Sequence, residues 1–206
     1  MQALFVHGMG RSPLSGWPLL RRLRRAGITT HTFAYAVTFE GFARIERRLA
    51  DRIARVASRG EYVLIGHSLG GVLIRAALRK LEGRCRLPAR VFLLGSPIAA
   101  VRVARMLGRN VAYRLLAGDC GQLLASEERM QAIGALSVPT TAIVGVRGWP
   151  AWRDPFGEAN DGIVCVAEAS ADWITDQVRV PVFHTVMPGN RHVSAAILER
   201  LRRDRA

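Results

Sequence analysis

Short apolar runs alternate along the chain with longer segments in which apolar residues recur every three or four positions. The runs are "ALFV", "ITTHTFAY", "YVLI", "RVFLLG", "TTAIVGV" and "VRVPVFH". Helical spacing appears in residues 14–26, 42–58 and 69–81, after Pro97, and near residues 193–203. Strands alternating with crossover helices predict an α/β fold, with a mostly parallel sheet of about six strands and helices on both faces.

The length of 206 residues suits one domain, 1–206, with a substantial core. No internal repeat, low-complexity tract or linker-like stretch divides it. Residues 99–130 depart from the rhythm, because two helical pieces, "AAVRVARML" and "NVAYRLLAGDCGQLLASEERM", precede the next strand. This segment is either a longer crossover packed on the sheet or a small lid or wall over a substrate site, since α/β ligands bind beyond the carboxyl ends of strands.

The formal net charge of +14 could attract nucleic acid or anionic lipid. Lys80 is the only lysine among 30 basic residues. In residues 42–60 the apolar positions fall on one side of the helix: Ile45, Leu49, Ile53 and Val56. Arginines fill much of the remainder: Arg44, Arg47, Arg48, Arg52, Arg55 and Arg59. Because no nucleic-acid-binding signature appears, we expect solvated arginine faces, no nucleic-acid partner and weak attraction to anionic surfaces.

Cys85, Cys120 and Cys165 lie far apart and form neither a CxxC pair nor a metal-ligand spacing. We therefore expect free thiols and no metal. The N-terminal "MQALFVHGMG" has no basic region or cleavage site and is expected to be a first strand, not a signal peptide. No apolar run is long enough to cross a bilayer, so we expect a cytoplasmic protein.

Ser68 lies in "GHSLG", a G-x-S-x-G pattern between a predicted strand and a predicted helix. This context is typical of a nucleophile elbow, in which a sharp turn holds the serine in strained backbone geometry. Side chains at Gly66 and Gly70 would collide with their neighbours in such a turn. The alternative is a glycine-rich tight turn with an idle serine.

A serine alcohol needs a base and a site for the oxyanion before it attacks a carbonyl carbon. In "FVHGMG", a turn at Gly8 after the first strand could point the N–H of Met9 at the reacting oxygen. The N–H of Leu69, directly after the serine, would be the second donor. The alternative is that "HGMG" is only a loop at a strand end.

The base is sought among five histidines. His7 and His67 lie within the two loops just described, and we expect them to brace these loops by hydrogen bonds. His31 falls in a strand pattern. We favour His184, at the end of "VRVPVFH", over His192, because a strand end at the same edge as the serine fixes the imidazole within reach.

An acid that orients the histidine is expected between the serine and the histidine in the chain. Asp161 in "EANDGIV" follows the strand "TTAIVGV", and Gly162 permits a tight turn beside it. Its rivals are Asp154 and Glu158 in the same loop and the more remote Asp119. We favour Asp161 because it closes the loop next to an apolar segment.

With these motifs in order, the chain resembles the α/β-hydrolase superfamily, most closely its compact lipase- and esterase-like members. "VHGMG", "GHSLGG", "NDGIV" and "FHTV…HVSAAIL" carry the resemblance from one end of the chain to the other. It implies a minimal α/β-hydrolase fold without a metal or organic cofactor. It also implies these site residues: Ser68 as nucleophile, Asp161 as acid, His184 as base, and Met9 and Leu69 as oxyanion donors.

Two details refine the resemblance. In the pattern a helix-starting valine follows the histidine after a short loop, and Val193 takes this place after His184. Related lipases often carry a G-T-P-H-type stretch, where this chain reads "GSPIAAV". The missing histidine and later glycine argue against a standard lipase pocket. Because no export signal is recognised either, we expect an intracellular esterase and not a fat-digesting enzyme.

The expected function is a serine hydrolase that cleaves carboxylic esters through an acyl-enzyme on Ser68, with a small-molecule ester or lipid-like substrate. The same three residues could serve a thioesterase, an amidase or an acyltransferase. A second class is a non-catalytic basic module that binds anionic membrane or nucleic acid. Labelling by a fluorophosphonate probe separates the two classes, because it requires an activated serine.

Overall fold

Six parallel strands form one sheet in the order β2-β1-β3-β4-β5-β6. The computed structural model describes residues 1–108, 110–149, 154 and 156–205. The strands are β1 Gln2–Val6, β2 Thr29–Phe33, β3 Tyr62–His67, β4 Arg90–Leu94, β5 Thr140–Gly145 and β6 Asp176–Val180. This architecture confirms the predicted α/β class with about six parallel strands.

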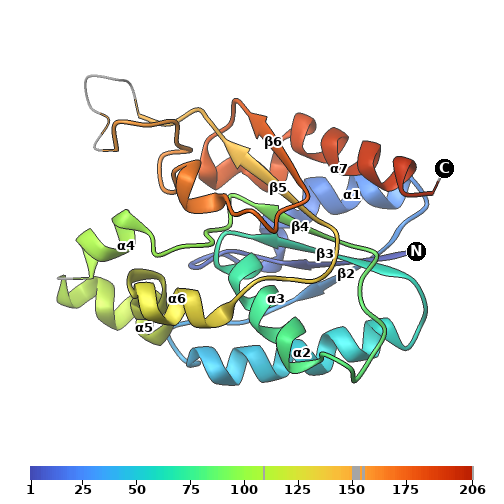
Figure 1. Ribbon diagram of the computed structural model, residues 1–206, viewed down its shortest axis with the longest axis horizontal. Helices are drawn as coiled ribbons and strands as arrows, with labels where there is room; N and C mark the ends of the chain where they lie inside the picture. The colour runs from blue at the N-terminus through green and yellow to red at the C-terminus, as the bar shows by residue number, and fades with distance from the viewer. Residues whose placement is uncertain (109, 150–153, 155, 206) are drawn as a thin grey trace.

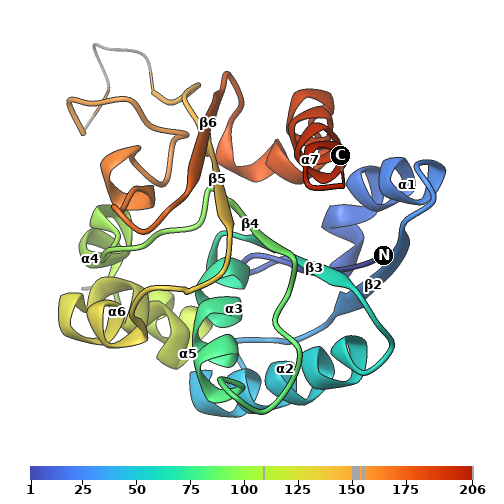
Figure 2. The same ribbon diagram turned by 45° about the vertical axis from the view of Figure 1, so that its right-hand side comes forward.

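Helices cover both faces of the sheet, as Figures 1 and 2 show. One face carries α1 Trp17–Arg25 and α7 Arg191–Arg203, and the other carries α2 Phe42–Ala57 and α3 Leu69–Lys80. Strand residues alternate between the two layers: Leu4 of β1 packs with α2 and α3, and the adjacent Phe5 packs with α1 and α7. The apolar runs that predicted strands are therefore buried on both sides.

The amphipathic pattern of α2 folds as expected, with Ile45, Leu49 and Ile53 buried. Helix α3 is apolar almost all round and lies between the sheet and its neighbours, and Arg75 within it is buried as well. Its guanidinium donates hydrogen bonds to Pro97 O and Gly134 O. Burial lowers the pKa of Arg75 to about 10. Arg75 is thus an exception to the expected solvated arginines.

The segment 99–130 folds into α4 Arg102–Leu107 and α5 Val111–Ala125, followed by α6 Glu127–Ile133. Helix α5 is broken at Gly118, whose φ is +54°, and a Cβ there would lie 2.7 Å from Val37 O. The next residue, Asp119, accepts a hydrogen bond from Phe42 N at 2.9 Å and caps α2. Asp119 is therefore a structural cap and an ion-pair partner of Arg129.

The last strand is shorter than predicted. It ends at Val180, before Pro181, which lacks the N–H that would continue the strand pairing. His184 does not end a strand but begins the 3-10 helix His184–Gly189. Two further 3-10 helices, Pro13–Gly16 and Ala167–Ala169, lie after β1 and before β6.

All three cysteines are free thiols, as expected. Within the described part of the chain, none of the helices has the length and apolar character needed to span a bilayer.

Candidate active site

Ser68 stands at the turn between β3 and α3 with φ +52° and ψ −126°. It is the one non-glycine residue with positive φ among those the structure describes. Its N–H donates to Leu94 O at 2.9 Å, and the hydroxyl of Ser96 donates to Ser68 O at 2.8 Å. A strained conformation held at both backbone polar groups is typical of functional sites.

Glycines make this turn sterically feasible. A Cβ at Gly66 would lie 2.4 Å from Gly71 Cα, and one at Gly70 would lie 2.2 Å from Val6 O. A Cβ at Gly71 would lie 2.3 Å from the Ser96 hydroxyl oxygen. The structure therefore confirms that side chains at Gly66 and Gly70 would collide with their neighbours. A side chain at Gly71 would collide as well.

Asp161 and His184 form a buried pair. His184 Nδ1 donates to Asp161 Oδ2 at 2.7 Å. The other carboxylate oxygen, Oδ1, accepts from Ile163 N at 3.0 Å and from Val164 N at 2.8 Å. The carboxylate is thus oriented by its own loop, as an acid that fixes a histidine tautomer must be.

Two glycines that the sequence analysis did not single out give this pair its space. A Cβ at Gly95, where φ is +49°, would lie 2.8 Å from Asp161 Oδ2 and 3.1 Å from His184 Nδ1. A Cβ at Gly145 would lie 2.6 Å from Asp161 Cβ. The sequence could have indicated both glycines, because Gly95 directly follows the apolar strand β4 and Gly145 ends the apolar strand β5.

The rival acids and histidines lie elsewhere. Asp154 accepts hydrogen bonds from Phe156 N and Asn160 Nδ2, and Glu158 is ion-paired with Arg102. His31 of β2 bonds with the side chain of Gln2 on β1. His192 is exposed in the first turn of α7, where its N–H donates to Asn190. Of the four acids considered from the sequence, Asp161 is the one that the structure places in hydrogen-bond contact with a histidine.

His67 connects the serine turn to the histidine. Its Nε2 lies 3.0 Å from His184 O and donates to this carbonyl. The imidazole rings of His67 and His184 are 4.9 Å apart. Burial, followed by the nearby His184, lowers the pKa of His67 to about 3, which keeps the ring neutral. The hydrogen bond expected of His67 therefore joins the serine turn to the segment that carries His184 and does not lie within the turn.

The loop after β1 is held by His7 and Tyr35. His7 Nδ1 donates to Gly8 O at 2.9 Å, its ring stacks on Tyr35 at 4.3 Å, and the Tyr35 hydroxyl donates to His7 O. Burial lowers the pKa of His7. Among the described residues, no hydrogen bond is donated by the backbone N–H of Met9 or Leu69.

A cavity of about 190 Å³ lies over the serine. Polar side chains in its lining include Ser68, His184, Arg11 and Thr185, and Gly8 and Met9 line it as well. Its other walls are mainly apolar and come largely from α4, α5 and the segment before α4: Pro97, Val101, Val103, Ala104, Leu107, Tyr113 and Leu124. Residues 99–130 thus supply part of the wall of this cavity.

The Ser68 hydroxyl forms no hydrogen bond within the described residues, so Ser68 and His184 share the cavity without direct bonding. Unliganded sites commonly have long or poorly aligned catalytic hydrogen bonds that tighten when substrate binds. The pairing of Nδ1 with Asp161 leaves Nε2 as the nitrogen of His184 available for a proton from Ser68.

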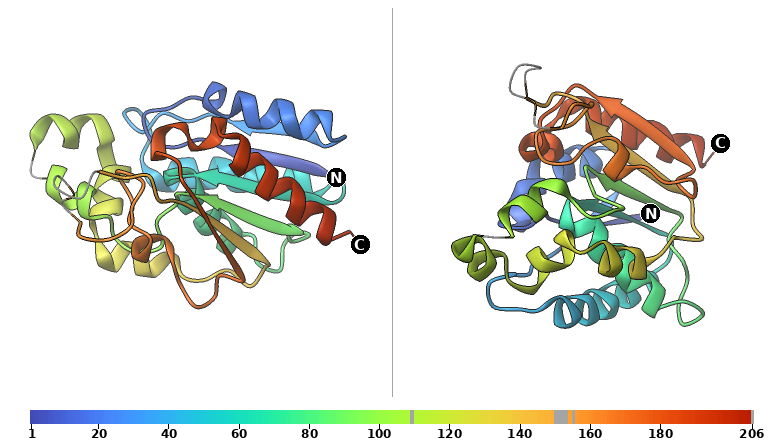
Figure 3. Two further views of the ribbon diagram at one scale, coloured as in Figure 1. Left: turned by 90° about the horizontal axis from the view of Figure 1, so that it is seen from above. Right: turned by 60° about the vertical axis from the view of Figure 1, so that its left-hand side comes forward.

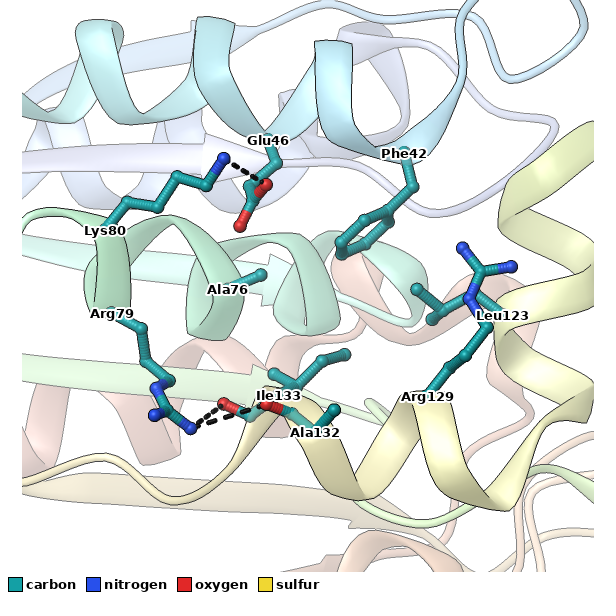
Figure 4. Close-up of a pocket in the computed structure, with 9 residues that line it drawn as sticks. All are labelled: Phe42, Glu46, Ala76, Arg79, Lys80, Leu123, Arg129, Ala132 and Ile133. Carbon is teal, nitrogen blue, oxygen red and sulfur yellow. Dashed lines mark hydrogen bonds and ion pairs between the residues drawn. The ribbon is translucent and has the colours of Figure 1, made fainter.

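A larger hollow of about 420 Å³ lies between α2, α3 and α6, away from these residues. Figure 4 shows Glu46 paired with Lys80 at one end and Arg79 bonded to the carbonyls of Ala132 and Ile133 at the other. It contains none of the predicted site residues. Nor do the described residues include a group of three His, Cys, Asp or Glu side chains arranged to hold a metal.

Known proteins resemble this chain in family and in fold. A family model described as "Alpha/beta hydrolase family" matches residues 3–206. No curated protein sequence matches the chain significantly.

Several solved structures share the fold. The mature lipase BlEst2 of Bacillus licheniformis is 16% identical, with a TM-score of 0.78 over 97% of this chain and 91% of that one. The thioesterase RedJ of Streptomyces coelicolor is 14% identical, with a TM-score of 0.62 over 98% and 85%. Tomato methylketone synthase I is 12% identical, with a TM-score of 0.63 over 98% of each chain. At these identities the likeness concerns the fold.

Proposed function

This chain belongs to the alpha/beta hydrolase family, and on that premise we propose that it cleaves carboxylic esters through an acyl-enzyme on Ser68. The observation that carries the proposal is the buried hydrogen bond of 2.7 Å between His184 Nδ1 and Asp161 Oδ2, at a cavity that Ser68 also lines. A hydrolase fold can host many activities, so the assignment depends on this site and not on the fold.

In the first step the Ser68 oxygen attacks the ester carbonyl carbon while His184 Nε2 takes the hydroxyl proton. Asp161 keeps the proton on Nδ1 and stabilises the imidazolium that forms. The tetrahedral intermediate collapses when the carbon–oxygen bond to the alcohol breaks. The imidazolium returns its proton to the departing alcohol, which leaves the acyl group on Ser68.

In the second step His184 takes a proton from water, and the hydroxide oxygen bonds to the acyl carbon. The bond to the Ser68 oxygen then breaks, the serine regains its proton from His184, and the carboxylic acid is released. Both tetrahedral intermediates carry a negative oxygen. The N–H groups of Met9 and Leu69 are the proposed donors to it, each worth about 3 kcal/mol of transition-state stabilisation.

The mainly apolar lining of the cavity supports an acyl group as its occupant, since burial of hydrocarbon is favourable and Ser68 lies in the same lining. The fold is also shared with a lipase and a thioesterase. An oxygen ester is the proposed substrate, and a thioester is the alternative that the test below distinguishes.

The test is labelling of the purified protein with a fluorophosphonate probe, beside hydrolysis of matched oxygen esters and thioesters of several acyl lengths. We expect labelling of the wild type and none of Ser68→Ala, together with faster turnover of the oxygen esters. Ser137→Ala is the control, because Ser137 is exposed before the amino end of β5 and does not line the cavity. Equal labelling of wild type and Ser68→Ala would remove Ser68 from the mechanism.

A further inference from the structure

Large apolar side chains are exposed on α4, on the first half of α5 and on the loop before α2. Leu115 and Leu116 are 71% and 65% exposed. Burying such side chains in a partner would be favourable, and monomeric soluble proteins rarely leave many of them together in water. The set, called the apolar rim below, is Phe39, Met106, Leu107, Val111, Leu115 and Leu116.

The elements that carry the rim are attached to one another. Helices α4 and α5 pack against each other. The Thr38 hydroxyl donates to Leu116 O at 3.0 Å and ties the loop that carries Phe39 to α5. Figures 1 and 3 place α4 and α5 together at the end of the molecule that lies away from the two termini.

The exposed half of α5 is anchored where the helix breaks. Gly118 lies against Val37 O, and Asp119 holds the N-terminus of α2. These two attachments join the base of the exposed stretch to the loop before α2 and to α2 itself.

The rim also borders the cavity of the candidate active site. Leu107 is partly exposed and lines the same cavity as Ser68, as does Tyr113 of α5. A surface seated on the rim would therefore lie next to the cavity.

The charge of the same segment is positive. Residues 99–125 contain four arginines and one acid, Asp119. Asp119 is already paired with Arg129. Arg105 of α4 and Arg114 of α5 are exposed and make no ion pair within the described part of the chain. Exposed apolar side chains with neighbouring unpaired arginines are complementary to an anionic lipid surface.

We propose that the apolar rim docks on an anionic lipid bilayer, with its apolar side chains in the headgroup boundary and Arg105 and Arg114 on lipid phosphates. A second copy of the chain is a poorer occupant, because two such surfaces would bring their arginines together. The docking does not depend on Ser68, so it extends the proposed function without resting on it.

The experiment measures co-sedimentation of full-length Ser68→Ala, which prevents hydrolysis, with phosphatidylcholine vesicles lacking or containing phosphatidylglycerol. We expect binding that requires phosphatidylglycerol and weakens with added salt. The Arg105→Glu/Arg114→Glu variant should bind at least about 30-fold more weakly, on the basis of about 1 kcal/mol per basic residue near the surface. Leu115→Ser/Leu116→Ser should also lose binding.

The controls carry the same changes at other exposed positions. Arg84→Glu/Arg86→Glu has the same net charge as Arg105→Glu/Arg114→Glu. Leu87→Ser removes an exposed leucine from the loop between α3 and β4. Both should bind like the parent. Equal weakening by the control pair would show a general charge effect and overturn the proposal, as would binding to neither vesicle.

Size-exclusion chromatography without lipid completes the test. If the parent is a dimer and Leu115→Ser/Leu116→Ser is a monomer, the rim binds a second copy of the chain and not a lipid surface. That result would overturn the proposal. Probe labelling of the wild type is read separately, so failure of the docking and failure of the hydrolase mechanism are distinguishable.

Discussion

Asp161 holds His184 at two points. Its carboxylate accepts from the ring nitrogen Nδ1 at 2.7 Å, and its backbone carbonyl accepts from His184 N at 2.9 Å. The backbone bond places the loop and the side-chain bond sets the tautomer, so one residue fixes both the position and the chemistry of the imidazole.

Replacing Asp161 by Asn should separate these two effects. The backbone bond survives, but the amide can no longer hold the Nδ1 proton and stabilise the imidazolium, so kcat should fall on the order of 10⁴-fold with KM little changed. Steady-state kinetics on an ester substrate measure this. The matched control is Asp154→Asn in the same loop, for which turnover close to that of the wild type is expected. An Asp161→Asn enzyme of nearly normal kcat would refute the assignment.

Replacing Gly70 by Ala should destabilise the protein by about 3 kcal/mol or more, because the new methyl would lie 2.2 Å from Val6 O and the two elements would have to separate. Denaturant unfolding gives the free energy. Gly83→Ala is the control: its φ is +70°, but no atom lies within 4 Å of its Cβ, so about 1 kcal/mol is expected from backbone strain alone. Equal losses at the two positions would contradict the close packing at the serine turn.

His67 should make the protein sensitive to acid. Its pKa is about 3 in the folded protein and 6.5 in its ordinary state. Between these values the unfolded chain binds a proton that the folded protein does not, so this contribution to stability is complete above pH 6.5 and declines as the pH falls. The expected decline approaches about 1.4 kcal/mol per pH unit for this group.

His67→Gln keeps an N–H that can donate to His184 O but cannot titrate in this range. Its free energy of unfolding should therefore depend less steeply on pH than that of the wild type between pH 3 and 6.5. Denaturant unfolding at several pH values measures the difference between the two proteins, in which the contributions of other groups cancel. Parallel curves for the two would show that His67 is not held neutral by burial.

The sequence by itself determined the features that depend on neighbouring residues. Apolar runs alternating with helical spacing predicted the six strands, since each pattern is set by which side chains must face the core. The strained turn at Ser68 was predicted in the same way, because the strand, the glycines and the helix that shape it are contiguous in the chain. The extent of β6 was overestimated, since Val182 and Phe183 continue its apolar pattern beyond Pro181, although the missing N–H of the proline ends the pairing.

Only the tertiary structure decided which distant groups meet. Asp119, Asp154, Glu158 and Asp161 all had the right order relative to His184, and local pattern could not show that one caps α2 and another pairs with Arg102. The space for the Asp161–His184 pair comes from Gly95 and Gly145, on two further strands. Such contacts join segments far apart in the chain, and they form because parallel strands bring their carboxyl ends to one edge of the sheet.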